Sequence, residues 1–129
     1  MAAQFRLIAD AGFQAVVNLA LPEHKDSLDN EGAIVTGLGM DYVHIPVHFD
    51  APRPEQLRRF CAVMRGYGET PVFVHCIMNY RVSAFMYQYL IMVLGYDAKD
   101  ARSEMFNHWQ PDSVWQEVMS WDRKTIGLV

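Results

Sequence analysis

Short apolar runs alternate along this chain with longer segments that carry apolar residues at helical spacing. The runs rich in β-branched residues predict three buried strands, at residues 15–19, 42–47 and 72–75. The longer segments predict helices, and glycine or proline stands at most of the breaks between them. The predicted helices cover residues 5–11, 26–38, 54–65, 81–94, 97–108 and 112–122.

The strand–helix–strand–helix–strand order indicates parallel pairing, because a crossover helix returns the chain to the same end of the sheet. We therefore expect one α/β domain over residues 1–129, with three α/β/α layers around a mainly parallel sheet. In such folds, sites form beyond the carboxyl ends of the strands.

Composition narrows the class of protein. A chain of 129 residues with 51% hydrophobic and 20% charged residues suits a soluble globular domain. The net charge of −4 and the lack of any basic run argue against a nucleic-acid partner or an anionic membrane surface. No apolar stretch reaches the ~20 residues of a membrane span.

The two cysteines do not suggest a disulfide framework. Cys61 falls on the apolar face of the helix predicted over 54–65, where a buried structural thiol is expected. Residues 1–4 lack the layout of a signal peptide, so a reducing cytoplasm is the predicted location.

The segment from Pro71 to Ser83 carries the most chemistry. Its apolar run ends in His75 and Cys76, and Arg81 then stands near a helix start. Helix N-termini attract anions, so the thiol should ionise more easily than the model value of about 8.5. The arginine fork can hold two phosphate oxygens. The alternatives are a buried structural cysteine and a surface arginine.

This order of residues resembles the signature loop of cysteine-dependent protein phosphatases, especially the compact dual-specificity type. Their pattern is His-Cys-x5-Arg-Ser/Thr, usually with glycine in the middle of the loop, whereas four residues separate Cys76 from Arg81 here. The loop could be one residue short, with Asn79 near the usual glycine. Alternatively, it could have full length, with Val82 in the arginine position.

The resemblance extends over most of the chain. Residues 8–19 and 42–47 look like the helix-to-strand entry and the next strand of a bacterial phosphatase-like group of unassigned function. Relatives usually carry an extra N-terminal segment and further strand structure beside the strand at 72–75. Without that segment the strand would be an exposed edge, and a homodimer would cover it.

The resemblance also implies a role for each candidate residue. Cys76 would be the nucleophile and Asp50 the general acid, although Asp50 could equally be a turn former before Pro52. His75 would orient the loop. Ser83 would assist the thiolate or bond the helix backbone. The phosphate-binding loop would consist of Ile77, Met78, Asn79, Tyr80 and Arg81.

Three functions fit these residues: a phosphatase, a phosphatase-fold module that binds a phosphate-bearing ligand without turnover, and sulfur or oxyanion transfer by the same thiolate. The expected partner is a phosphate-bearing substrate or an oxyanion. We expect no cofactor and no metal, because His44, His48 and His75 lack the further ligands of a zinc site. Trp109, Trp115 and Trp121 are expected in the core.

Overall fold

Three parallel strands form the centre of the computed structural model, which describes residues 2–22 and 30–128. The strands are β1 (Ala15–Asn18), β2 (Asp41–His44) and β3 (Val72–His75), in the order β2-β1-β3. Both pairings are parallel and start at Ala15, which lies opposite Asp41 on one side and Val72 on the other. The predicted α/β class and its parallel sheet are therefore confirmed.

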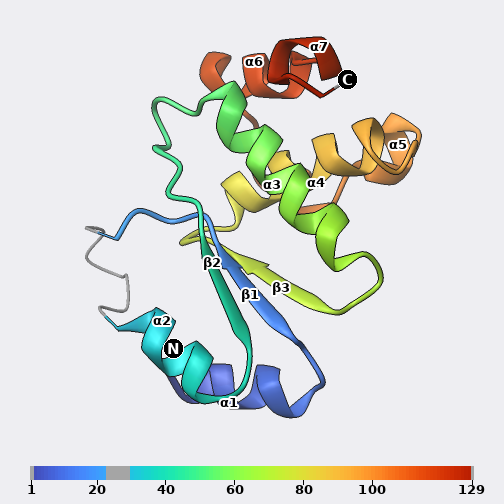
Figure 1. Ribbon diagram of the computed structural model, residues 1–129. Coiled ribbons are helices and arrows are strands. Elements are labelled where there is room, and N and C mark those ends of the chain that lie inside the picture. The colour runs from blue at the N-terminus through green and yellow to red at the C-terminus, as the bar shows by residue number, and fades with distance from the viewer. Residues whose placement is uncertain (1, 23–29, 129) are drawn as a thin grey trace.

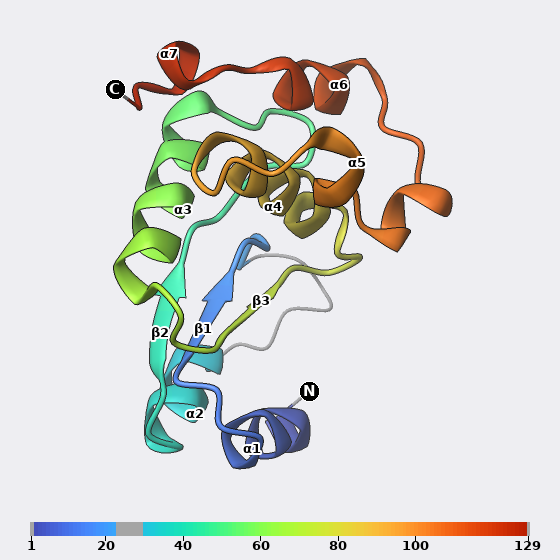
Figure 2. The same cartoon turned by 90° about the vertical axis from the view of Figure 1, so that its right-hand side faces the viewer.

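Helices cover both faces of this sheet (Figures 1 and 2). One face carries α1 (Ala2–Asp10) and α2 (Glu31–Gly37), and the other carries α3 (Pro54–Tyr67) and α4 (Tyr80–Met92). The C-terminal part packs outside α3 and α4. It comprises α5 (Ala98–Ala101), the 3₁₀ helix η1 (Glu104–Asn107), α6 (Ser113–Ser120) and α7 (Arg123–Ile126).

The core has two parts because β1 is buried on both faces, as expected for the central strand of a parallel sheet. A small cluster fills the space between the sheet, α1 and α2, and includes Phe5, Val16, Val35 and Met40. A larger cluster lies under α3, α4 and α6. Its largest fully buried side chains include Leu57, Phe60, Phe85, Trp115 and Val118. The fully buried Cys61 belongs to this cluster, as predicted.

Several predicted boundaries were wrong. The second strand ends at His44 instead of residue 47, because Pro46 has no N–H for the ladder, although Ile45 and Val47 still donate to the β1 end. Gly66 lies inside α3, which ends at Tyr67 and is followed by Gly68 as its C-cap, with a φ of 58°. Residues 26–29 of the helix predicted over 26–38 lie outside the described residues, and α2 begins at Glu31.

The C-terminal third differs most from the expectation. The single helix predicted over 97–108 is split between α5 and η1, because Arg102 and Ser103 take extended backbone angles. The helix α7 was not predicted. Asp122 initiates it by accepting a hydrogen bond of 2.8 Å from the backbone N–H of Thr125.

Within the described ranges, β3 pairs with β1 alone and so forms one edge of the sheet. The homodimer that would cover this edge stays a prediction, which light scattering can test. In the same ranges, no helix has both the length and the apolar character needed to cross a membrane.

Truncation of Phe60 should destabilise the fold strongly. Its ring is fully buried and lies 5.6 Å from the ring centroid of Phe85. Removing a buried aromatic ring of this kind costs about 3–5 kcal/mol, so Phe60→Ala should lower the urea midpoint accordingly. The neighbouring exposed Arg59 provides the control, since Arg59→Ala should change the free energy of unfolding by no more than about 0.5 kcal/mol. Similar losses in both variants would contradict this packing.

Candidate functional site

Cys76 follows β3 directly and lies at the carboxyl end of the sheet. The parallel register places Asn18, His44 and His75 side by side at this end. The backbone N–H of Leu19 donates to the carbonyl of His75 over 2.9 Å and so extends the ladder. Cys76 is only 7% exposed. The sheet therefore fixes the backbone that carries the thiol.

A pocket of about 270 Å³ opens beside this thiol. Its wall includes Phe49 from the β2–α3 connection, while the other lining residues belong to the turn after β3 and to the first turn of α4. Met78 lies at its rim with 59% of its surface exposed. The lining residues are Phe49, Cys76, Ile77, Met78, Tyr80 and Arg81. The pocket thus combines one thiol and one guanidinium with mainly apolar walls.

The turn into α4 depends on Asn79, which has a φ of 64° in the left-handed region. It is the only non-glycine residue of the described ranges with a positive φ. Asparagine tolerates this conformation better than most residues. The carbonyl of Asn79 accepts from both the backbone N–H (3.0 Å) and the hydroxyl (2.8 Å) of Ser83. Ser83 thus bonds the helix start, one of its two predicted roles.

Arg81 stands in the first turn of α4 and is 7% exposed. Its Nη1 donates to the carbonyl of Val47 over 2.8 Å, and its guanidinium lies 5.9 Å from the ring centroid of Phe49. One N–H is therefore committed to the β2–α3 connection. The guanidinium has five donors, so others stay available for an anion in the pocket.

Asp50 is exposed and does not line the pocket. It lies in a turn closed by a hydrogen bond of 3.2 Å from the backbone N–H of Ala51 to the carbonyl of His48. Its neighbour Phe49 forms the pocket wall, and the indole N–H of Trp115 donates to the Phe49 carbonyl over 2.7 Å. The turn that carries Asp50 is thus anchored to α6 at the pocket edge.

His75 points away from the pocket, toward the α1–α2 face. Its Nε2 donates to the carboxylate of Glu31 over 2.8 Å, and both side chains are at most 10% exposed. Tyr42 lies next to Glu31, and burial, with a smaller contribution from this carboxylate, raises its pKa to about 12. Asn18 donates to the Tyr42 hydroxyl over 3.0 Å. A buried polar network therefore lies behind the site.

Sequence patterns gave no signal for this network, because residues 31 and 75 are 44 positions apart. Sequence patterns also gave no signal for the aromatic rings that gather at the Cys76 pocket. The rings of Tyr80 and Trp109 stack at 4.7 Å with planes 8° apart, and Trp109 packs in the core as predicted. The Nε2 of His44 donates to the carbonyl of Ala20 over 2.7 Å.

The parallel sheet, its helices on both faces and the turn from β3 into α4 define the protein-tyrosine-phosphatase-like fold. Residues 3–120 match the family described as DSP-PTPase phosphatase fused to NAD+ kinase, and the chain belongs to this family. None of the curated proteins matches it significantly.

Solved structures agree with this assignment. The chain is similar to a candidate phosphatase (DUF442) from Shewanella putrefaciens CN-32, with 34% identity and a TM-score of 0.82 over 92% of this chain and 78% of that one. Two more distant structures share the fold. PTPMT1 has 18% identity and a TM-score of 0.77 over 98% of this chain and 87% of that one. Tk-PTP has 21% identity and a TM-score of 0.74 over 100% of this chain and 88% of that one.

Asn79→Gly should keep the fold, since glycine adopts the left-handed conformation freely, and its stability should stay within about 0.5 kcal/mol. Asn79→Val should cost about 1–3 kcal/mol, because a β-branched residue is strained at this φ. Urea unfolding of both variants measures the difference. Equal stabilities would show that the turn does not need a positive φ.

Alkylation should separate the two thiols. Burial raises the pKa of Cys61 to about 11, so only about one molecule in a thousand carries its thiolate at pH 8. Cys76 lines an open pocket. Iodoacetamide at pH 8 should therefore modify Cys76 first, and peptide mass spectrometry identifies the site. Prior labelling of Cys61 would contradict this order, and raising the pH toward 11 should increase Cys61 labelling.

Proposed function

We propose that the chain is a cysteine-dependent phosphatase that hydrolyses a phosphomonoester through a phosphocysteine intermediate. The observation that carries this proposal is the shared pocket of Cys76 and Arg81 at the start of α4. A phosphate held there meets a nucleophile, a guanidinium fork and a helix N-terminus together. Stabilisation of charge on the phosphoryl oxygens is the main demand of this reaction.

In the first step the Cys76 thiolate attacks phosphorus. An S–P bond forms while the bond to the ester oxygen breaks, and the carboxylic acid of Asp50 gives its proton to the leaving oxygen. In the second step the Asp50 carboxylate takes a proton from water, and the water oxygen attacks phosphorus. The S–P bond then breaks, and phosphate and the thiolate are released.

The burial of Arg81 in the pocket supports the shorter alignment of the loop, with four residues between the nucleophile and the arginine. Val82 is only partly buried and packs against the core cluster, and it does not line the pocket. Backbone N–H groups of the loop from Ile77 to Tyr80 complete the proposed anion cradle. The exposed Met78 at the rim would contact the rest of the substrate.

A second candidate is a module that binds a phosphate-bearing ligand without turnover. Two observations favour it: Arg81 already donates to Val47, and Asp50 is outside the pocket lining. For either function, the free thiols of Cys61 and Cys76 fit a reducing cytoplasm. One distant structural relative, TpbA from P. aeruginosa, has been solved in complex with pTyr, so a phosphorylated tyrosine is a reasonable first test ligand.

A phosphomonoester assay with phosphotyrosine tests the proposal. Cys76→Ser should reduce phosphate release below about a thousandth of wild type, because the S–P bond can no longer form. Arg81→Ala should lower kcat/KM by about 10²–10³-fold through lost charge stabilisation. Asp50→Ala should lower kcat by roughly 10²-fold and remove the basic limb of its pH profile.

The exposed Arg53 supplies the matched control, and Arg53→Ala should retain activity. Thermal unfolding in phosphate or sulfate separates the two candidates. An inactive wild type that these anions still stabilise, with the effect lost in Arg81→Ala but kept in Arg53→Ala, would overturn the phosphatase and support the binding module.

A further inference from the structure

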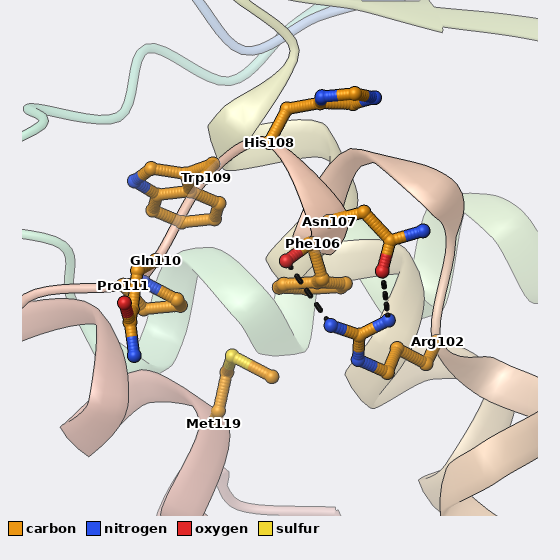
Figure 3. A pocket seen from close by; sticks show the side chains of 8 residues that line it. All are labelled: Arg102, Phe106, Asn107, His108, Trp109, Gln110, Pro111 and Met119. Atoms are coloured by element: carbon orange, nitrogen blue, oxygen red, sulfur yellow. Dashed lines mark hydrogen bonds between the residues drawn. The ribbon is translucent and has the colours of Figure 1, made fainter.

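A second cavity, of about 590 Å³, lies between η1 and α6 and is larger than the Cys76 pocket (Figure 3). Arg102 stands at one end and Trp109 at the other, while Met119 rises from α6 between them. Its walls combine amide, imidazole and guanidinium groups with apolar side chains.

Arg102 is held in a fixed orientation at this cavity. Its Nη1 donates to Oδ1 of Asn107 over 2.9 Å, and its Nη2 donates to the carbonyl of Phe106 over 3.0 Å. The guanidinium also lies 5.7 Å from the ring centroid of Phe106. These contacts use two of the five N–H donors, so a ligand can take others without reorganising the side chain.

The charge on Arg102 has no acidic partner in the described part of the chain. The ion pairs of these residues involve Arg6, Arg53 and His75 instead. A guanidinium fork that is oriented but not paired is suited to a phosphate or carboxylate. His108 and Gln110 add further polar groups to the lining of the cavity.

The cavity adjoins the Cys76 pocket. Trp109 lines the second cavity and stacks on Tyr80, which lines the first, at 4.7 Å. Next to Arg102, the hydroxyl of Ser103 lies 3.4 Å from that of Ser83 in the first turn of α4. The segment from 102 to 109 therefore contacts the start of α4 at both its ends, and one layer of aromatic rings separates the cavities.

We propose that this second cavity is an accessory site for substrates that carry a second acidic group, phosphate or carboxylate, joined to the scissile phosphate by an apolar body. Arg102 binds the second acidic group, and Trp109, Phe106 and Met119 contact the apolar part. The inference rests on the proposed function, because it assumes that the first phosphate occupies the Cys76 pocket. It makes Arg102 a residue for substrate selection with no part in the bond-breaking steps.

Calorimetry on the Cys76→Ser variant tests this site without requiring turnover. The probes are linear alkanediol bisphosphates of increasing length, the matching carboxyalkyl phosphates, and alkyl monophosphates of equal length. One chain length should bind about tenfold more tightly than its monophosphate, because the second group makes an intramolecular contact. A gain with both bisphosphates and carboxyalkyl phosphates indicates general anion recognition, and a gain with one class identifies the second group.

In the Cys76→Ser variant, the additional substitution Arg102→Gln should remove this gain in affinity and leave the affinity for alkyl monophosphates unchanged. Arg102→Lys should retain part of it, because lysine keeps the charge without the fork. Arg102→Gln could also disturb the fold of residues 102–107, so a second variant is needed. His108→Gln changes the lining of the cavity and none of the hydrogen bonds of Arg102. It should reduce the gain by a few fold. Arg59→Gln is the matched exposed arginine control and should change nothing.

The accessory site would be overturned if alkyl monophosphates bound as tightly as the bisphosphates and carboxyalkyl phosphates at every chain length. An equal loss of affinity for the bisphosphates in Arg102→Gln and Arg59→Gln would also overturn it. Failure of the proposed function looks different. In that case wild type releases no phosphate from any probe, while the Arg102-dependent gain in binding persists. If no probe binds at all, both proposals are wrong.

Discussion

The turn that joins β3 to α4 is the constraint on which the site depends. Cys76 directly follows His75, the last paired residue of β3, and α4 begins four residues after the cysteine, at Tyr80. The chain can reverse in that space because Asn79 adopts a positive φ, and its carbonyl then accepts two hydrogen bonds from Ser83. This geometry puts Arg81 beside the thiol in a buried first turn.

Contacts from distant parts of the chain support this turn on both faces of the sheet. On one face, Arg81 binds the Val47 carbonyl and the Trp115 indole binds the Phe49 carbonyl, so the β2–α3 connection is held against α4 and α6. On the other face, Glu31 holds His75. Removing one partner of such a buried pair leaves the other unsatisfied, which is costly, so these contacts restrict how far the pocket can deform.

The C-terminal segment adds a separate property. Residues 102–109 do not extend as the predicted helix, and the break at Arg102 and Ser103 creates both the second cavity and the stack of Trp109 on Tyr80. In a phosphatase of this kind the turn after β3 would supply the chemistry. The C-terminal segment would distinguish one phosphorylated substrate from another.

The parallel α/β class, the three strands and the order Cys76, loop, Arg81 could be predicted from the amino-acid sequence, because they depend on local periodicity and on neighbours in the chain. The sequence also indicated the tolerant residue at Asn79. Three further relations became visible only in the folded chain: Asp50 lies outside the pocket lining, Glu31 binds His75, and Trp109 separates two cavities. Those relations join residues far apart in the chain, and packing of the whole fold determines which of them meet.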